Sequence, residues 1–440
     1  MAVTLAVNDT NWFFSPYNWI VTGSTSAQTN NAGAYFKLGF TGTSASLSFD
    51  TSALTGASVP AGSYPIIIFS VDNGPWQSVQ TSSGGTVSLA SGLAAGAHQI
   101  WCVLKSVDIN YDRWNTPIES LKITGCVIDT AASSAPPTLN GSRRMLIYGD
   151  SITEGERATG ILMPGSSDAS TVYGHALGLA LGCEYGIVGF GGQGWVAGGA
   201  GNVPIFGTAW SSYWNGQSRL SGGLLTPAPS YVFCCQGTND GLQALSAATV
   251  TANAAAWLTN VRAAAGLSAL VGLIVPFGGY MQAALVAAMA SYQAAPDARA
   301  VVLDISTIPG TNLGISSPAN LYSTDGTHLN AWGQSVVAAD LAALWGGILA
   351  RTPNAFRKAL ITTATTAVVK PTAGILWSLA CTVATATQVT IYDNASAASG
   401  QKLYDGVPPA GGQSVGLWIP ATNGITVVTT GTATVEITYS

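Results

Sequence analysis

The first 130 residues carry short runs in which apolar and polar side chains alternate, separated by Gly, Ser, Asn and Pro. Among these runs are AYFKLGF, ASLSFD, YPIIIFSVD, HQIWCVLKSV and ESLKITGCVI. A period of two is typical of strands that bury one face, and no long helical period interrupts the pattern. We therefore predict a jelly-roll-like antiparallel β-sandwich over residues 1–130, followed by a linker of small residues and Pro over 131–142.

The pattern changes between residues 143 and 352. Five apolar strand candidates, MLIYG, EYGIVGF, YVFCCQG, LVGLIVPF and AVVLDIS, alternate there with Ala-rich helix candidates such as ATVTANAAAWLTNVRAAAG. Such alternation predicts a mostly parallel sheet that is covered by helices on both faces. Residues 143–352 should therefore form a three-layer α/β domain.

The last segment, residues 353–440, returns to strand-like runs that include GILWSLACTV, TQVTIYDN and GITVVTTG. These runs predict a second, smaller β-sandwich module. A chain of 440 residues is also too long for one ordinary domain. The predicted fold class is therefore a multidomain protein, with a central α/β domain between two β modules.

Composition narrows the range of partners. Charged residues make up only 8% of the chain and the net charge is −5, so there is no basic surface for nucleic acid. The most apolar run, SVVAADLAALWGGILA, is interrupted by Asp340, so no membrane span is predicted. The first residues lack the pattern of a signal peptide. A charge-poor surface rich in Gly and Thr is typical of extracellular or virion proteins, and we expect one of these locations.

The six cysteines show no Cys-x-x-Cys spacing, so no structural zinc site is predicted, and no metal or organic cofactor is implied. Cys102 and Cys126 lie in two strand-like runs. They are expected either to pair in a disulfide or to stay buried as free thiols.

Ser151 lies at a sharp turn in RRMLIYGDSITEG, directly after an apolar strand candidate. One interpretation makes it a helix N-cap, which would satisfy unpaired backbone N–H groups. The other makes it a nucleophile at the carboxyl end of a strand, where open α/β sheets place their chemistry.

A nucleophilic serine needs a base, and histidine suits that role near neutral pH. His98 lies in the N-terminal β segment and His175 within a predicted helix, where a packed or surface role fits better. His328 follows Asp325 by three residues in STDGTHLNAWG, so the carboxylate can reach the imidazole around one turn. The alternative is that Asp325 is a turn residue and His328 a solvent-facing start of the last helix.

Donors for an oxyanion are expected at two further strand ends. YVFCCQGTND places Asn239 after a buried strand, where it is either an amide donor or an Asx-turn residue. GFGGQG follows another strand, and its backbone N–H groups are not blocked by side chains. All four segments follow strands whose carboxyl ends should meet at one crevice, which favours Ser151 as a nucleophile over a cap.

The ordered segments GDSITEG, GFGGQG, GTND and DGTHLN resemble the four motif blocks of the SGNH, or GDSL, hydrolase superfamily. The resemblance implies a flavodoxin-like sheet and ester hydrolysis. By matching position, Ser151 would be the nucleophile and first oxyanion donor. Gly192 would be the second donor, with Gly191 as the fallback, and Asn239 the third. His328 would be the base and Asp325 the residue that orients it.

A β-sandwich before an SGNH domain is also similar to the family-two carbohydrate esterases, which remove acetyl groups from polysaccharides; the phrase YDRWNTP adds to this likeness. The C-terminal phrases VTIYDNASAASG and GLWIPATNGITV resemble small β modules of phage virion proteins. Together these resemblances imply a serine esterase whose substrate is an acetylated carbohydrate or another short-acyl ester. The sequence leaves open whether the protein forms a homo-oligomer through its β modules.

Several alternatives stay open at this point. Trp195, Trp210, Tyr213 and Trp214 are expected either to stack on sugar rings or to pack a long loop. Glu154 and Arg157 are interpreted as salt-bridge partners near Ser151, and Asp240 competes with Asp325 as the carboxylate. A catalytically weak glycan-binding protein and a sugar O-acyltransferase with the same triad are the rival functions. A lipase for long acyl chains is less favoured because no apolar lid segment is visible.

Overall fold

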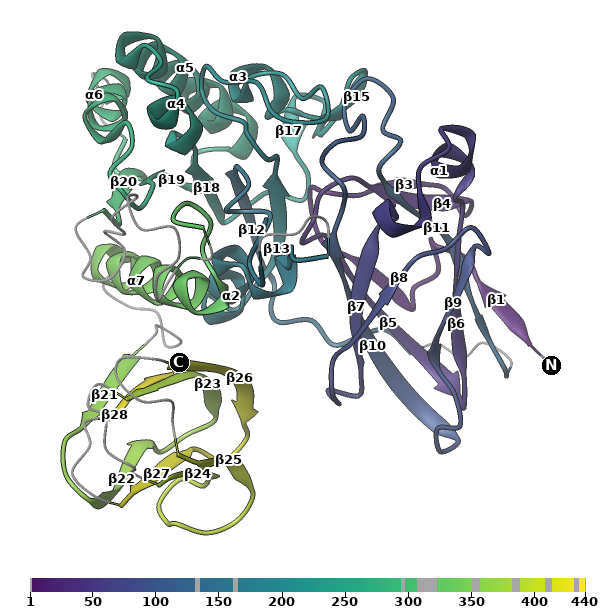
Figure 1. The fold of residues 1–440 in the computed structure, drawn as a ribbon, viewed down its shortest axis with the longest axis vertical. Helices are drawn as coiled ribbons and strands as arrows, with labels where there is room; N and C mark the ends of the chain where they lie inside the picture. The colour runs from purple at the N-terminus through teal and green to yellow at the C-terminus, as the bar shows by residue number, and fades with distance from the viewer. Residues whose placement is uncertain are drawn as a thin grey trace.

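The computed structural model describes residues 2–130, 135–160, 165–293, 297–306, 323, 325–349, 357–381, 388–407, 414–430 and 435–439. Residues 131–134 of the predicted linker and the predicted boundary at 352/353 lie outside this set. Figure 1 shows a mixed segment of helices and a sheet, with one β module to its right and a second, smaller one below it.

Two antiparallel sheets form the N-terminal segment. The first contains β1 (Val3–Leu5), β3 (Ile20–Thr22), β4 (Ser26–Thr29), β6 (Ala45–Phe49), β9 (Thr86–Ala90) and β11 (Leu121–Ile128). The second contains β2 (Trp12–Phe14), β5 (Tyr35–Gly42), β7 (Ile66–Val71), β8 (Gln77–Gln80) and β10 (Gly96–Ser106). Two short helical turns, α1 (Ser52–Gly56) and η1 (Ala61–Ser63), lie between strands. Leu47 and Ile123 of one sheet pack with Leu38 and Ile100 of the other, so the sheets form a sandwich.

Cys102 and Cys126 are both buried and free. They belong to β10 and β11, which lie in different sheets of the sandwich. The free-thiol interpretation is therefore the one that the structure adopts.

The central sheet has five parallel strands in the order β13 (Cys183–Gly189), β12 (Arg143–Gly149), β18 (Tyr231–Cys235), β19 (Leu270–Val275) and β20 (Ala300–Asp304). These are the five strands that the apolar runs predict. The chain leaves β12 for β13 on one side and returns to β18 on the other. The order of strands therefore reverses at β12, which is where such sheets open a crevice.

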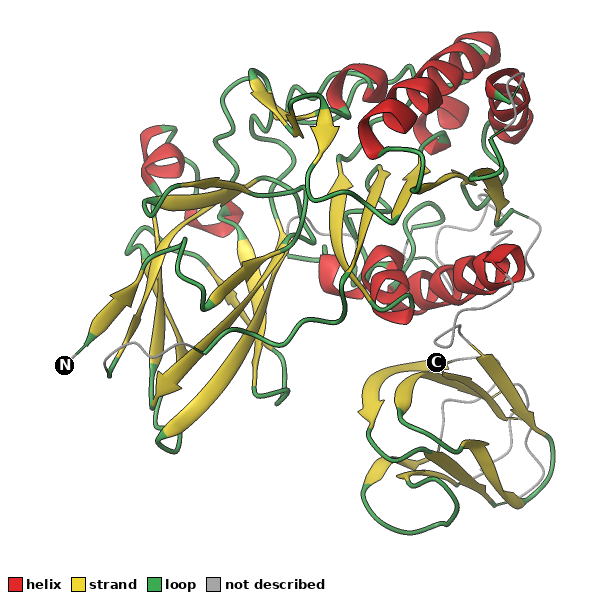
Figure 2. Cartoon of the chain, turned by 180° about the vertical axis from the view of Figure 1, so that it is seen from behind, coloured by secondary structure: helices red, strands yellow, loops and turns green. Residues whose placement is uncertain are grey.

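Helices cover both faces of this sheet (Figure 2). On one face lie η2 (Ala169–Thr171), α2 (Tyr173–Ala180) and α7 (Ala331–Leu349), and on the other lie α3 (Phe206–Ala209), α4 (Thr238–Leu242), α5 (Ala247–Ala265) and α6 (Gln282–Tyr292). Successive side chains of a strand point to opposite faces. Accordingly Ile147 packs in the core beneath α2, and Tyr148 packs in the core beneath α5. Among the described residues no helix is both long and apolar enough to span a membrane.

The connection from β13 to β18 carries two small hairpins. They are formed by β14 (Ser212–Trp214), β15 (Gln217–Ser218), β16 (Leu220–Ser221) and β17 (Leu224–Leu225).

The C-terminal segment forms two four-stranded antiparallel sheets. One contains β21 (Arg357–Ile361), β23 (Gly374–Cys381), β26 (Ser414–Ala421) and β28 (Val435–Tyr439). The other contains β22 (Thr365–Lys370), β24 (Val389–Asp393), β25 (Lys402–Gly406) and β27 (Ile425–Thr429). Leu376 and Ile437 of the first sheet share a core with Ile391 and Val427 of the second.

The sandwich and the central sheet are joined by a continuous core. Tyr35 and Val103 of the sandwich pack with Tyr185 and Ile187 of β13. Polar contacts reinforce this interface, since Lys37 Nζ lies 2.8 Å from Glu184 Oε1 and both side chains are almost fully buried. The N-terminal segment is therefore fixed against β13, the edge strand of the central sheet.

Candidate active site

A tight turn follows β12 and presents Ser151. A side chain at Gly149 would bring its Cβ within 1.8 Å of Thr153 Oγ1, so only glycine fits at the end of the strand. Asp150 Oδ1 accepts a hydrogen bond from the backbone N–H of Ile152 at 3.0 Å. The chain then continues through turns and not through a helix, so Ser151 is not an N-cap.

Ser151, His328 and Asp325 form one hydrogen-bonded series. Ser151 Oγ lies 3.0 Å from His328 Nε2, and His328 Nδ1 lies 2.8 Å from Asp325 Oδ2. Asp325 Oδ1 also accepts from the backbone N–H groups of His328 at 2.7 Å and Thr327 at 3.0 Å. The carboxylate therefore holds both the backbone and the ring of the histidine, with the second ring nitrogen directed at the hydroxyl.

Helix α7 is attached to the turn that carries Ser151. Gln334, which is fully buried, donates from Nε2 to the carbonyl of Ile152 at 2.8 Å. Its Oε1 accepts from the backbone N–H of Tyr173 at 2.9 Å. Because α7 begins three residues after His328, these bonds fix the position of the imidazole relative to the serine.

Burial and hydrogen bonding set the charge states of Asp325 and His328. Burial alone would raise the pKa of Asp325, but the hydrogen bonds from His328 and Thr327 outweigh it and hold that pKa well below its usual value. Burial lowers the pKa of His328, and the Asp325 carboxylate offsets only part of this effect. At neutral pH the pair is therefore an ionised carboxylate and a neutral imidazole, as a general base requires.

Arg157 is a further residue at this centre. Its Nη1 donates to Asp325 Oδ2 at 2.9 Å, the same oxygen that contacts His328. The sequence indicates Arg157 only as a salt-bridge partner near Ser151. It does not indicate that Asp325, far away in the chain, is the partner. The one feature of the sequence that could have indicated this role is a positively charged side chain six residues after the candidate nucleophile.

In the glycine loop that follows β13, the backbone N–H groups of Gly191 and Gly192 have different surroundings. The N–H of Gly191 donates to Glu154 Oε1 at 2.7 Å, and Glu154 Oε2 in turn lies 2.9 Å from Arg113 Nη2. Gly192 has φ +76°, a conformation suited to glycine. Within the described parts of the chain the N–H groups of Gly192 and Ser151 have no hydrogen-bond acceptor. The amide at Gly192 is therefore available to a ligand, whereas that of Gly191 is already used.

Asn239 lies in the first turn of α4, between the serine turn and the glycine loop. Its Nδ2 donates to the carbonyl of Gln193 at 2.9 Å and lies 3.4 Å from Asp150 Oδ2. The next residue, Asp240, is fully buried and accepts from the backbone N–H groups of Trp195, Val196 and Ala197. Asp240 therefore fixes the loop after Gly192 and does not replace Asp325 beside the histidine.

The predicted sugar-stacking aromatic residues need a correction. Trp195 is 0% exposed and packs edge-on against Phe206 and Trp257. Trp210 is 7% exposed and belongs to the same core. Neither ring is open to a sugar, because the loop folds inward under the helices. Tyr213 and Trp214 are half-buried neighbours on β14.

The other two histidines lie elsewhere. His175 is buried, with Nδ1 2.5 Å from the hydroxyl of Tyr185, and burial lowers its pKa to about 3. His98 lies 2.6 Å from Asp72 in the sandwich. Within the described residues no three His, Cys, Asp or Glu side chains are grouped to hold a metal ion.

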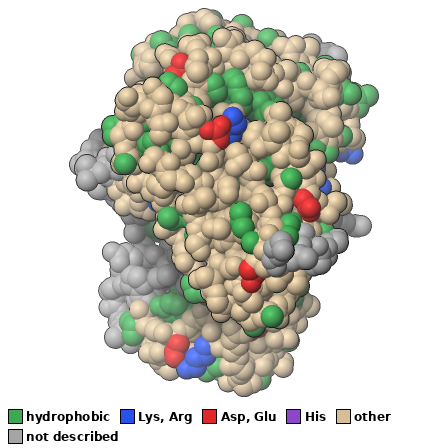
Figure 3. Space-filling model, turned by 90° about the vertical axis from the view of Figure 1, so that its right-hand side faces the viewer, with side chains coloured by type: hydrophobic (Ala, Val, Ile, Leu, Met, Phe, Trp, Pro, Cys, Tyr) green, Lys and Arg blue, Asp and Glu red, His purple; other side chains and the backbone are tan. Residues whose placement is uncertain are grey.

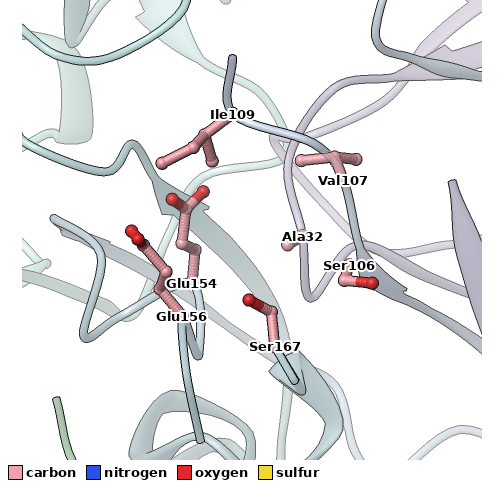
Figure 4. A pocket seen from close by; sticks show the side chains of 7 residues that line it. All are labelled: Ala32, Ser106, Val107, Ile109, Glu154, Glu156 and Ser167. Carbon is pink, nitrogen blue, oxygen red and sulfur yellow. The ribbon is translucent and has the colours of Figure 1, made fainter. Parts of the chain in front are cut away.

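A narrow pocket adjoins the site where the sandwich meets the serine turn (Figure 4). It is lined by Ala32, Ser106, Val107, Ile109, Glu154, Glu156 and Ser167. Its volume of about 10 Å³ suits a single water molecule and is too small for a sugar. Burial raises the pKa of Glu156 to about 7.

This chain is similar to known proteins in structure but not in sequence. No family model matches the chain, and no curated protein matches it in sequence. A family-two carbohydrate esterase from Cellvibrio japonicus matches with a TM-score of 0.64 at 16% identity, over 80% of this chain and 98% of that one. A family-two carbohydrate esterase from Clostridium thermocellum, in complex with cellohexaose, gives 0.61 at 18% identity, over 77% and 99%.

An acetyl xylan esterase from the rumen bacterium Butyrivibrio proteoclasticus is similar as well, with a TM-score of 0.61 at 13% identity. The match covers 80% of this chain and 98% of that one. These likenesses extend over nearly the whole of each esterase, so they include more than the central sheet. The chain therefore has the SGNH-like fold of the family-two carbohydrate esterases.

Proposed function

We propose that this protein is a serine esterase that removes acetyl or other short acyl groups from carbohydrate. The observation that carries the proposal is the series Ser151–His328–Asp325, with a neutral imidazole 3.0 Å from the serine hydroxyl. Within the described residues the backbone N–H groups of Ser151, in the serine turn, and of Gly192, in the glycine loop, have no hydrogen-bond acceptor. A nucleophile, a base, an orienting carboxylate and donors are the set that acyl transfer requires.

In the proposed reaction Ser151 Oγ attacks the ester carbonyl as His328 Nε2 takes its proton. The N–H groups of Ser151 and Gly192 bind the resulting oxyanion, and the Asn239 amide joins them by exchanging its long, 3.4 Å contact with Asp150 Oδ2 for the oxyanion. His328 then gives the proton to the departing sugar hydroxyl, which leaves an acyl group on Ser151. A water molecule, deprotonated by the same imidazole, attacks this acyl-enzyme and releases the carboxylic acid, and the proton returns to Ser151. Asp325 stays ionised and stabilises the imidazolium.

Two observations support a small acyl group on a neutral carbohydrate. The structurally similar proteins include an acetyl xylan esterase and an esterase in complex with cellohexaose. The chain's low charge suits a neutral polymer, and we further propose that the protein acts outside cells or as part of a virion.

Chain-length selectivity tests the proposal. Hydrolysis of 4-nitrophenyl acetate, butyrate and octanoate should show the highest kcat/KM for acetate, and acetylated xylan should release acetate. Equal or faster turnover of octanoate would contradict the assignment to short acyl groups. Transfer of acetyl to added cello-oligosaccharide in preference to water would instead identify a sugar O-acyltransferase. A folded protein with no turnover of any ester would support the glycan-binding alternative.

A further inference from the structure

A groove opens on the sandwich at the opposite end of the parallel sheet from Ser151. It is lined by Lys37, Ser70, Asn73, Gln99, Trp101, Thr138, Leu139 and Asn140. Its volume is about 210 Å³, against the roughly 10–15 Å³ that a cavity needs to hold one water molecule. We call it the Trp101 groove. It has room for a ligand considerably larger than a water molecule.

Strand register explains why these side chains meet. Trp101 of β10 lies directly across from Lys37 of β5 and from Ser70 of β7. Side chains at alternate positions, such as Ile100 and Cys102, point into the sandwich core. The opposite face carries Val103 into the interface with the central sheet and Trp101 and Gln99 into the groove. The groove is therefore built on the face of this sheet that lies away from the sandwich core.

The groove combines aromatic surface with unused amides. Trp101 is half-buried, and Trp76, which is 43% exposed, packs edge-on against it at 5.8 Å. The side-chain amides of Gln99 and Asn73 form no hydrogen bond within the described residues. Such amides can both donate to and accept from hydroxyl groups, and indole rings pack against the apolar faces of sugars.

Lys37, the only cation among the described residues that line the groove, is already neutralised. Lys37 Nζ donates to Glu184 Oε1 at 2.8 Å, Asn140 Oδ1 at 3.0 Å and the carbonyl of Thr138 at 3.3 Å. An ammonium group has three donors, so none is left for an anionic ligand. The face seen in Figure 3 is likewise mostly uncharged. These contacts favour a neutral, hydroxyl-rich ligand over an acidic one.

We propose that the Trp101 groove is a second saccharide site, which holds a neutral stretch of polysaccharide away from the serine. Glu184, which contacts Lys37 in the groove, lies beside Arg144 of β12 in the parallel sheet. Ser151 follows Arg144 by seven residues along the chain. At about 3.3 Å per residue the groove is roughly 20 Å from Ser151. The site therefore binds a different part of a polymer from the part beside the serine. The proposal does not depend on ester hydrolysis.

Calorimetric titration of the whole chain tests the proposal, with cellohexaose and xylohexaose as neutral probes and an oligogalacturonate as the acidic probe. We expect at least one neutral probe to bind and the acidic probe not to bind. Gln99→Ala and Trp101→Ala should each weaken binding about tenfold or more, because each removes a direct contact. Gln77→Ala removes an exposed amide from the neighbouring strand β8 and serves as the matched control. Thermal unfolding checks that each variant is folded.

Trp101 also packs on Tyr35 and His175, so Gln99→Ala decides the question if Trp101→Ala does not fold. Ser151→Ala should bind the neutral probes as wild type does, which separates this site from the esterase proposal. Unchanged affinity in Gln99→Ala and Trp101→Ala would place the binding elsewhere and overturn the proposal. Failure of both neutral probes to bind, or a preference for oligogalacturonate, would also overturn it.

Discussion

The hydroxyl of Ser151 can give its proton only to an imidazole that is neutral, and the surroundings of His328 favour that state. Burial lowers the pKa of His328 below its ordinary value of 6.5, and the positive charge of Arg157 lowers it further. Because the neutral form is the base, kcat/KM should rise with pH through this lowered pKa and be flat at neutral pH. The acid side of the pH profile therefore reports on the environment of His328.

Arg157→Gln should move that acid limb to higher pH. The substitution removes the positive charge that lowers the pKa of His328, and it leaves Asp325 Oδ2 to the imidazole alone. The check is kcat/KM for 4-nitrophenyl acetate as a function of pH. Arg299→Gln, the same change at an exposed arginine in another part of the chain, is the control. An acid limb that stays in place or moves to lower pH would show that Arg157 does not act on His328.

Asn239→Ala should lower kcat by a factor of about 10² to 10³ while the fold is retained, as expected for the loss of one oxyanion donor. The amide lies between Asp150 and Gln193, so its removal also loosens the glycine loop. Steady-state kinetics and circular dichroism provide the check. Near-normal kcat in a folded variant would remove Asn239 from the oxyanion hole.

At the scale of the elements, the sandwich supports the glycine loop through a buried ion pair. Arg113, in the loop that links β10 to β11, lies 2.9 Å from Glu154, and Glu154 accepts from the N–H of Gly191. Both side chains are almost fully buried. The phrase YDRWNTP thus contributes a residue that stabilises the loop around the candidate oxyanion donor.

Arg113→Met should destabilise the protein by about 3–5 kcal/mol, because it leaves the Glu154 carboxylate buried without its partner. Adding Glu154→Gln should recover part of that loss, since the uncompensated charge is then gone. Urea unfolding of the two single variants and the double variant measures the coupling. Effects that add within about 0.5 kcal/mol would show that the two residues act independently.

The sequence predicts the elements of this site better than the contacts between them. Apolar runs predict all five parallel strands, and the motif blocks mark Ser151, Asn239, Asp325 and His328, which the fold brings to one crevice. The contacts of Arg113 and Arg157 join segments far apart in the chain, so no local pattern indicates them. The sequence leaves Trp195 open between stacking on a sugar ring and packing a loop, and the structure buries it in the core.

At the scale of the whole molecule, we expect the sandwich and the central sheet to unfold as one cooperative unit, because they share a buried core. Tyr35 packs on Tyr185, and its hydroxyl bonds to Glu184 across the interface. The sequence predicted two domains joined by a linker and gave no sign of this shared core. Interfaces between distant segments depend on shape, which apolar periodicity does not encode.

Lys37→Met should lower the urea midpoint by an amount equivalent to about 3–5 kcal/mol, since Glu184 is then buried without its cation. The transition should stay single when followed by tryptophan fluorescence and by far-ultraviolet circular dichroism. Lys122→Met, which removes a half-exposed ion pair with Asp50 within the sandwich, should have a much smaller effect. Two separate transitions, or equal effects of the two substitutions, would contradict the shared core.

The central claim is that Ser151 is the nucleophile of an esterase. The most direct test compares kcat/KM for 4-nitrophenyl acetate in the wild-type chain, in Ser151→Ala and in Ser82→Ala, a control at an exposed turn. We expect a loss of at least about a thousandfold in Ser151→Ala and none in Ser82→Ala. Turnover by folded Ser151→Ala within about tenfold of wild type would contradict it.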